Sequence, residues 1–501
     1  MSRSKAAYKF ILSSGLIQIV IIVSGLILPP LIISEYGSEV NGLVNTIKQL
    51  VTYFSIVSLG LGITSQVALY KPIKDNDWNK INGVLSATHY FFKKTGVVFA
   101  ILVLMTAILF PYLGNRDISR ITIFSIIAIY GIGAISEYIL ISKYKIFLAA
   151  NQKQNIISNI QSIGIIFTTA FSVVLIYFHV SIILIILIST TSYLIRLFLT
   201  LYYVSKNYPN LNFNVNPDFS ALDGKWEAFS YQIANMIINY TPLILVALFC
   251  GLVDASIFSV YNMIFFSLSM ITAIFSAGFS ASFGNLIVEN DLKKLRNAFS
   301  IYELIYRNIM FIVYTIAFIT TASFMSIYIM NSDGVNYVIP SLVIAFVLQG
   351  VFKSFRIPFV TLVEAVGDFR VNKTLNIYEA ILNVLLSIIF LNYFGFIGVL
   401  YGAVIAGLIR SILYVTYTQK IILRSKNNFY FIKTILNIIT SVFLYVFFGN
   451  EEVNGFIDFT YYLLKISIVV TISFLLLNGL LDFKSSVLGV QRIKKIVLKR
   501  I

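Results

Sequence analysis

Residues 10–33 read FILSSGLIQIVIIVSGLILPPLII, a run that contains no charged side chain. A helix needs about 20 consecutive apolar residues to cross the hydrocarbon core of a bilayer. The run follows Arg3, Lys5 and Lys9 and is longer than the roughly 7–15-residue apolar core of a signal peptide. We therefore interpret it as the first of a series of membrane-spanning helices.

The composition of the whole chain agrees with this interpretation. Of the 501 residues, 58% are hydrophobic and 12% are charged, whereas roughly 25% of the residues of a soluble protein are charged. Similar apolar runs recur at about 43–70, 84–113, 119–148, 155–178, 181–204, 228–250, 255–288, 298–330, 338–363, 374–393, 396–422, 429–449 and 460–482. The sequence predicts an all-α integral membrane protein with about 14 transmembrane helices.

The distribution of charge predicts the orientation of the chain. Lys and Arg exceed Asp and Glu by 37 to 21, and such cations collect in cytoplasmic loops. If the spans alternate in direction, most of the lysines and arginines fall on the same side of the membrane as the N-terminus, including Arg307 and Lys433 at span ends. The outer loops contribute only Arg116 and Arg120. We expect a multi-pass protein with both termini in the cytoplasm. The positive charge is thus explained without a nucleic-acid partner, and none is expected.

The two halves of the chain resemble each other. LIRLFLTLYY at 194–203 matches LIRSILYVTY at 408–417. In all, four matches pair Gly60 with Gly278, Ala149 with Ala365, Asn159 with Asn376 and Arg196 with Arg410, at nearly the same separation along the chain. Their common order and spacing predict an internal duplication.

The duplication predicts a domain organisation. Six spans separate equivalent positions, so the two copies share one orientation and are related by a pseudo-two-fold axis along the membrane normal. We expect one six-helix bundle at 1–204, a cytoplasmic linker at 205–227, a second six-helix bundle at 228–424, and two further helices with a basic cytoplasmic tail at 425–501. Two such bundles around a shared cleft are typical of transporters that work by alternating access.

The sequence offers little for catalysis. One cysteine, Cys250, and two histidines, His89 and His179, leave no plausible metal site. The Walker pattern GxxxxGK[ST] is missing from the sequence. We therefore expect a protein that is not an enzyme, without catalytic residues, metal or cofactor, whose energy comes from the membrane potential or from an H⁺ or Na⁺ gradient.

Three segments carry a family resemblance: LILPPLIISEYGSEVNGLVNTIKQLVTYFSIVSLGLGITSQVALY at 26–70, NPDFSALDGKWEAFSYQIANMI at 216–237, and GDF at 367–369. With the span layout, they resemble the polysaccharide (Wzx-like) flippases of the multidrug/oligosaccharidyl-lipid/polysaccharide (MOP) exporter superfamily. This resemblance implies a lipid-linked oligosaccharide flippase of the bacterial cytoplasmic (inner) membrane. It implies that undecaprenyl-pyrophosphate-linked repeat units of O-antigen, capsule or another surface polysaccharide move from the inner to the outer leaflet.

The resemblance also implies partners and leaves alternatives. Membrane lipid, the polysaccharide polymerase and the glycosyltransferases of the same pathway are the expected partners. A peptidoglycan-precursor flippase of the same superfamily remains open. A multidrug or cation antiporter typically places acids in the first and seventh spans, whereas 10–33 and 228–250 contain no Asp or Glu. Two other classes are less consistent with the sequence. A membrane-embedded polymerase typically has a large outer loop. A scaffolding membrane protein would not need charged residues inside its spans.

Charged residues inside the predicted spans are candidates for substrate contact. A pyrophosphate cannot cross hydrocarbon without partners, because burying an unpaired charge is costly. The candidate cationic path consists of Lys48, Arg196, Lys353, Arg356 and Arg410. The alternative is that Lys48 reaches the outer headgroups and that the others anchor span ends at the inner interface.

Among the acids that fall inside spans, Glu137 and Glu379 are the best placed. We expect them to neutralise the cations of the tenth span, and the alternative is that they bind a coupling ion.

Overall fold

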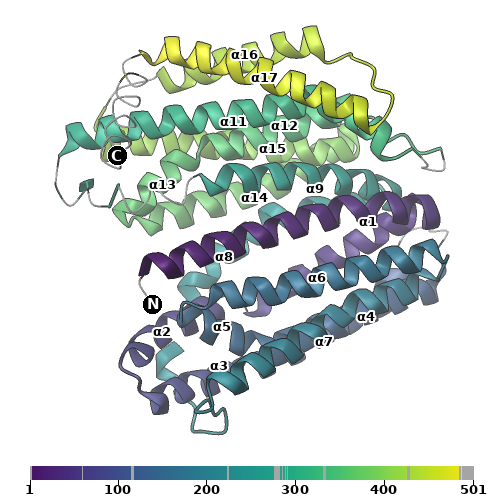
Figure 1. Cartoon of the computed structure of the whole chain (residues 1–501), viewed down its shortest axis with the longest axis vertical. Helices are drawn as coiled ribbons and strands as arrows, with labels where there is room; N and C mark the ends of the chain where they lie inside the picture. Colours follow the sequence, from purple (N-terminus) through teal and green to yellow (C-terminus); the bar gives the residue numbers. More distant parts are fainter. Residues whose placement is uncertain are drawn as a thin grey trace. The chain divides into compact units, whose positions relative to one another are not determined.

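The computed structural model describes residues 3–58, 60–113, 118–222, 225–275, 291–330, 334–425 and 429–483, with short pieces at 283–284, 286–287, 289 and 487. Over these ranges the chain is helical and contains no strand. Thirteen helices there are long and apolar enough to cross a membrane. The predicted all-α membrane fold is therefore confirmed (Figure 1). Gly278 of the first sequence match and the basic tail beyond 487 lie outside the described residues.

The first two predicted spans form one bent helix. α1 (Arg3–Phe54) contains a single non-helical residue, Gly37, with φ 85° and ψ 163°. Glycine adopts such angles without the steric cost of a Cβ, so the predicted outer loop is a bend. α1 ends before a short 3₁₀ turn, and α2 (Leu61–Lys74) begins after Gly60 at φ 91°. The predicted continuous span at 43–70 is thus interrupted.

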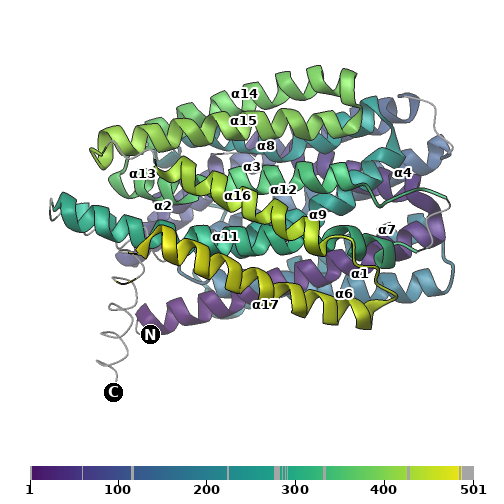
Figure 2. The ribbon, with the colours of Figure 1, turned by 90° about the horizontal axis from the view of Figure 1, so that it is seen from above.

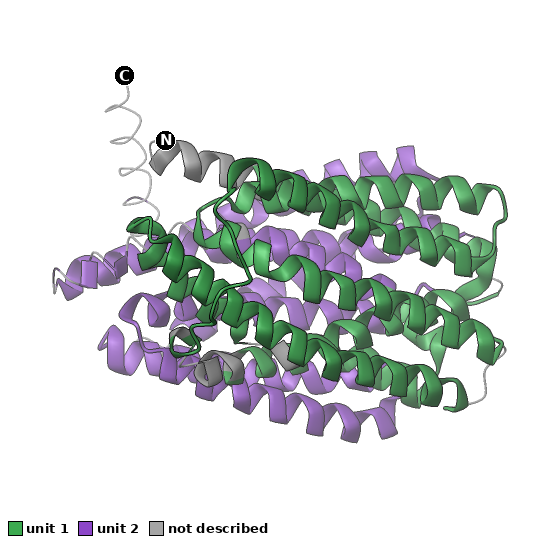
Figure 3. Cartoon of the chain, turned by 90° about the horizontal axis from the view of Figure 1, so that it is seen from below, with its two compact units in different colours: residues 1–259, 331–335 green, residues 260–330, 336–501 purple. Residues whose placement is uncertain are grey.

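The first compact unit comprises residues 1–259 and 331–335 (Figure 3). After α1 and α2, its helices are α3 (Trp78–Leu109), α4 (Arg120–Ser136), α5 (Ser142–Ala150), α6 (Gln154–Tyr177), α7 (Ile182–Asn207), α8 (Lys225–Phe249) and the start of α9 (Leu252–Ile274). α6 contacts α1 and α7, and α4 contacts α3 and α7, so these helices form a bundle (Figure 1).

The polar connector after α7 lies against α3. Asn82 donates to the carbonyl oxygen of Asn210 over 3.0 Å and accepts from the backbone N–H of Asn212 over 3.1 Å. The Ser86 hydroxyl donates to the carbonyl oxygens of Phe213 and Val215 at 3.0 and 2.8 Å. The linker predicted at 205–227 is therefore ordered over its described part, because backbone groups of the connector find partners on α3.

The second compact unit comprises residues 260–330 and 336–501. After the rest of α9, its helices are α11 (Leu292–Tyr328), α12 (Pro340–Phe355), α13 (Ile357–Val366), α14 (Phe369–Phe394), α15 (Phe396–Tyr417), α16 (Phe429–Phe448) and α17 (Phe456–Leu481). α14 and α15 form an antiparallel pair, and α16 and α17 both contact α11 (Figure 2). The compact units divide the chain inside α9, later than the linker where the predicted duplication divides it.

Local backbone geometry repeats along the chain at nearly the spacing of the sequence matches. Positive φ angles pair Gly37 (85°) with Gly251 (109°), Gln152 (57°) with Gly367 (82°), and His179 (53°) with Gly395 (60°). Gly37 stands at the bend inside α1, and the other five residues stand between consecutive helices. The turns of the two halves are therefore alike even where glycine is replaced by another residue.

Helix starts repeat in the same way. Asp77 caps α3 by accepting the backbone N–H of Lys80 over 3.1 Å, and Asp291 caps α11 by accepting that of Lys294 over 3.0 Å. These backbone hydrogen bonds favour the ionised carboxylate, so the pKa values of Asp77 and Asp291 lie below the usual value. The two caps have the same separation along the chain as Arg196 and Arg410.

Candidate functional site

In the first unit, Glu137 is held by two cations. Arg196 of α7 donates through Nη1 to the Oε2 atom of Glu137 over 3.3 Å, and Lys145 of α5 donates to Oε1. The three side chains are between 14% and 24% exposed. Two cations for one carboxylate leave this cluster with one surplus positive charge.

A local change of helix geometry brings Lys145 to the face that carries Glu137. Eight residues of α-helix turn by about 800°, which would leave two side chains about 80° apart. The π-helical turn Glu137–Ile141 joins α4 to α5 and absorbs one extra residue. Lys145 therefore takes the angle of a residue seven positions on, roughly 20° from Glu137.

Gly164 of α6 provides the space for Arg196. A Cβ atom at Gly164 would lie 3.1 Å from Nε and 3.3 Å from Cγ of Arg196. The guanidinium group also lies 5.5 Å from the centroid of the Tyr193 ring. A side chain at position 164 would displace the arginine from this place.

A cavity of about 770 Å³ lies beside the cluster, inside the first unit. Residues of α1, α3, α4, α6 and α7 line it, and its charged lining residues are Lys48 and Glu137. The Lys48 side chain is exposed, and its Nζ atom lies 5.8 Å from the centroid of the Tyr130 ring. Among the described residues, Lys48 has no acidic partner. It is the accessible cation of this cavity.

A smaller cavity of about 420 Å³ adjoins the larger one. The two share Tyr138 and Ser142 in their walls. Lys145 lines the smaller cavity and Glu137 lines the larger one. The ion pair between these residues therefore lies in the wall that separates the two spaces.

In the second unit, Glu379 of α14 also binds two cations. Arg356 donates through Nη1 to Oε1 over 2.9 Å, and Arg410 of α15 donates to Oε2. The three side chains are 4–8% exposed. Arg410 is further oriented by Tyr414, whose hydroxyl accepts from Nη2 over 3.4 Å. Lys353 is half-buried one turn before Arg356 on α12.

A break in the tenth predicted span positions Arg356. Pro358 has no backbone N–H, so a regular hydrogen bond is lost and the helix divides into α12 and α13 at Arg356. Gly407 of α15 faces the same place, where a Cβ atom would lie 3.7 Å from the Oε1 atom of Glu379 and 3.9 Å from the Nη1 atom of Arg356. These are ordinary contact distances, so Gly407 packs directly against this ion pair and a Cβ atom would fit beside it.

The duplication relates the two arginines but not the two acids. Arg196 and Arg410 are equivalent, and each contacts a glutamate. When positions are counted from the match of Ala149 with Ala365, the counterpart of Glu137 is Lys353. When they are counted from the equivalent turns at 152 and 367, the counterpart of Glu379 is Gly164. Each half thus supplies the carboxylate from a different helix.

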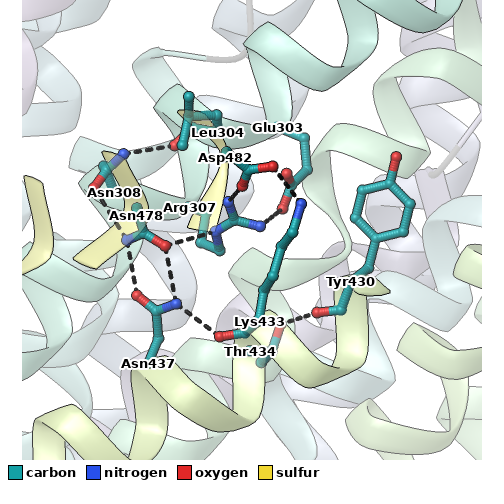
Figure 4. A network of polar contacts seen from close by, with 10 residues as sticks. All are labelled: Glu303, Leu304, Arg307, Asn308, Tyr430, Lys433, Thr434, Asn437, Asn478 and Asp482. Atoms are coloured by element: carbon teal, nitrogen blue, oxygen red, sulfur yellow. Dashed lines mark hydrogen bonds and ion pairs between the residues drawn. The ribbon is translucent and has the colours of Figure 1, made fainter. Parts of the chain in front are cut away.

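The second unit contains a buried polar network that the charge pattern of the sequence does not predict (Figure 4). Arg307 of α11 donates to Glu303 over 2.7 Å, to Asn478 over 3.1 Å and to Asp482. Lys433 of α16 donates to Asp482 as well. Arg307 is 2% and Glu303 4% exposed. Arg307 and Lys433 are therefore parts of a buried ion-paired group, although the charge pattern placed them with the cytoplasmic cations.

Amide side chains extend this network. Asn478 of α17 donates to Asn308 of α11 over 3.1 Å and to Asn437 of α16 over 2.8 Å. The network therefore joins α16 and α17 to α11. Two asparagines inside apolar spans, Asn437 and Asn478, were the signal in the sequence, because such amides need partners inside the protein.

No protein-family model and no curated protein matches the chain. Solved structures do match it. The lipid II flippase MurJ in an inward closed conformation has a TM-score of 0.73 at 14% identity and covers 95% of this chain and 99% of its own. An inward-facing multidrug resistance MATE family transporter of the MOP superfamily has a TM-score of 0.60 at 16% identity. This match covers 80% of this chain and 94% of the transporter. MATE in the bent conformation has a TM-score of 0.53 at 16% identity, and this match covers 87% of this chain and 97% of that one.

The chain has the fold of these MOP transporters. The MOP fold extends over nearly the whole chain, because the MurJ match covers 95% of it. At this level of sequence identity, the likeness defines the fold, and the substrate must be inferred from the site. Of the five predicted cations, Lys48 lines the cavity, Arg196 belongs to the first ion-paired cluster, and Arg356 and Arg410 belong to the second, while Lys353 lies one turn before Arg356.

Proposed function

We propose that the protein is a MOP-fold flippase for an anionic, lipid-linked oligosaccharide. In this proposal an undecaprenyl-pyrophosphate-linked repeat unit of a surface polysaccharide moves from the inner to the outer leaflet of the bacterial cytoplasmic membrane. The movement follows the alternating-access mechanism expected from the duplicated halves. No catalytic step and no cofactor are part of the proposal.

The surplus of cations in the membrane-spanning segments carries the proposal. Glu137 is shared between two cations, and so is Glu379. Lys48 adds a further positive charge to the cavity of the first unit. Cations inside a membrane protein are costly and mark substrate or ion paths, and diphosphate is the group of the proposed substrate that needs them.

The same charges argue against an organic cation as the substrate. The glutamates Glu137, Glu303 and Glu379 inside the membrane-spanning helices are each paired with arginine or lysine, so none of them is free to attract a cation. The segments 10–33 and 228–250 contain no acid that could take this role. A cationic drug would therefore meet net positive charge in both units.

Lipid II is a second candidate substrate. The observation that favours it is the likeness to MurJ, a lipid II flippase, over nearly the whole chain. Lipid II and the repeat-unit carrier share a polyprenyl diphosphate, so the cation surplus suits both. The sugar and peptide attached to the diphosphate distinguish them.

The membrane potential supplies energy in this proposal. Moving one charge through 100 mV is worth about 2.3 kcal/mol. Two phosphate charges that leave a cell with a negative interior therefore gain on the order of 5 kcal/mol per 100 mV. The alternative source is a gradient of H⁺ or Na⁺.

The experiment that tests the function is leaflet transfer in proteoliposomes. The purified protein is reconstituted with a fluorescent undecaprenyl-diphosphate oligosaccharide, with lipid II as competitor, beside the variants Lys48→Ala and Arg410→Ala. We expect rapid transfer that either substitution slows. Transfer of lipid II in preference to the oligosaccharide would favour the second candidate. Absence of both activities, with transport of a small organic cation, would refute the proposal.

A further inference from the structure

The larger cavity of the first unit lies at the middle depth of its bundle. Thr168 in its wall is about 21 Å from the start of α6 and about 14 Å from its end, at the rise of an α-helix. Lipid offers no hydrogen-bond partners at this depth. Polar groups that line a cavity here are therefore expected to serve a ligand or water.

The wall of this cavity is unusually rich in hydroxyl groups. Eleven of its nineteen lining residues are Ser, Thr or Tyr. Several of these hydroxyls donate to their own helix, as Thr52 does to the carbonyl oxygen of Lys48 over 2.7 Å and Ser189 to that of Ile185 over 3.0 Å. Their oxygen atoms keep lone pairs that can accept from a ligand. The wall therefore presents hydrogen-bond acceptors to a molecule that brings its own donors.

Three tyrosines line the wall, and one of them, Tyr138, shares a hydrogen bond of 2.8 Å with Thr95. Tyr130 of α4 and Tyr193 of α7 line the cavity, and within the described residues neither hydroxyl has a hydrogen-bond partner. Tyrosine rings offer a flat apolar face beside a polar tip. A sugar ring has the matching combination, with C–H groups on its face and hydroxyls around its edge.

The charge of the cavity fits an anionic ligand. Glu137 is neutralised by Lys145 and Arg196, and Lys48 is accessible without an acidic partner among the described residues. At about 770 Å³, the volume lies in the range of roughly 300–1,000 Å³ that small-molecule sites occupy. The cavity is therefore large enough for the sugars next to a diphosphate, and the rest of a longer glycan would lie elsewhere.

We propose that this cavity is a carbohydrate subsite, in which the sugar attached to the diphosphate contacts Tyr130 and Tyr193 while Lys48 faces the anionic group. The proposal rests on the proposed function, because it takes the substrate to be a sugar diphosphate. It adds that the first bundle recognises the sugar itself. Recognition of this kind selects among lipid carriers that share the diphosphate.

The test is a calorimetric titration of the full-length protein in nanodiscs. The probes are geranyl diphosphate capped as its terminal methyl ester, called geranyl diphosphate below, and geranyl diphosphate linked to one glucose or one N-acetylglucosamine, so that all three carry the same charge. We expect a sugar-linked probe to bind at least about fivefold more tightly than geranyl diphosphate, since each sugar hydrogen bond contributes about 2- to 10-fold. Tyr130→Phe and Tyr193→Phe should each reduce this preference about 2- to 10-fold and leave the affinity for geranyl diphosphate unchanged. Lys48→Gln should weaken binding of all probes.

The control is Tyr202→Phe, on the same helix as Tyr193. Tyr202 is 59% exposed and lies outside the cavity wall, so we expect unchanged binding. If the sugar adds no affinity, or if both cavity tyrosine variants keep the full preference for it, the subsite is refuted while the function stands. If the wild-type protein binds none of the three probes and transfers no lipid-linked oligosaccharide, the function and the subsite are refuted together.

Discussion

The buried network of the second unit permits a quantitative prediction for Asp482→Asn. Asp482 accepts from Arg307 and Lys433, and each of these side chains is at most 11% exposed. Removing one partner of a buried ion pair costs about 3–5 kcal/mol. Asparagine keeps the shape and loses the charge, so Glu303 remains to balance two cations. We expect a loss of about 3 kcal/mol, the lower limit, because Asp482 and Lys433 lie at the edge of the buried region.

A second substitution separates charge from packing. Asp482→Asn leaves one cation in surplus, and combining it with Lys433→Met removes that cation. The double variant then keeps the Arg307–Glu303 pair at 2.7 Å with balanced charge. We expect the double variant to lose about 1–2 kcal/mol less than the sum of the two single losses, as is usual for residues in one network. The control is Lys465→Met on α17, whose partner Glu451 is 43% exposed. That change should cost below about 1 kcal/mol.

The assay is unfolding in mixed micelles of dodecyl maltoside and sodium dodecyl sulfate, followed by circular dichroism. It reports the free energy of unfolding for the wild-type protein and the four variants. If Asp482→Asn is as stable as the wild type, the network has no energetic role. If the single losses simply add, the two residues act independently and the reasoning on charge balance is refuted.

Three further outcomes follow from the clusters and the helix contacts. Glu379→Gln leaves Arg356 and Arg410 without a counter-charge, and we expect a loss of about 3–5 kcal/mol in the same titration. Gly402→Val would press against the backbone of α14 at Ser387 and should cost at least about 1–3 kcal/mol, whereas Gly479→Ala meets no atom within 4 Å and should be tolerated. Lys48→Gln should slow leaflet transfer at least about tenfold, the equivalent of one ~1.4 kcal/mol interaction, while leaving the unfolding free energy within ~0.5 kcal/mol.

The membrane fold could be predicted from the sequence because apolar runs and charge patterns follow directly from bilayer thickness. The runs identify helices such as α16 and α17 closely, since predicted spans at 429–449 and 460–482 correspond to Phe429–Phe448 and Phe456–Leu481. The apolar runs do not predict the places where a single residue bends or interrupts a helix. Gly37 converts a predicted loop into a bend, and the turn before Gly60 interrupts a predicted span.

The partners of charged residues were harder to predict. The candidate residues Glu137 and Glu379 could be recognised inside apolar runs, but their partners depend on which helix faces which. Lys145 reaches Glu137 only because a π-helical turn rotates it by about one residue. Asp482 stands at the end of a span, where the sequence pattern is that of an ordinary loop acid. Its burial depends on α11 and α16, which are far away in the sequence.

The two ion-paired clusters suggest what the duplicated halves have in common. Arg196 and Arg410 are equivalent arginines, and a buried arginine needs a carboxylate nearby. The first half provides it from the end of α4, at the position equivalent to Lys353, and leaves Gly164 beside the arginine. The second half provides it from α14, where Glu379 stands at the position of Gly164 when residues are counted from the turns at 152 and 367. The positions of the acids differ, yet each cluster keeps two cations for one carboxylate. The common property is thus the surplus positive charge, the property on which the proposed transfer of a diphosphate rests.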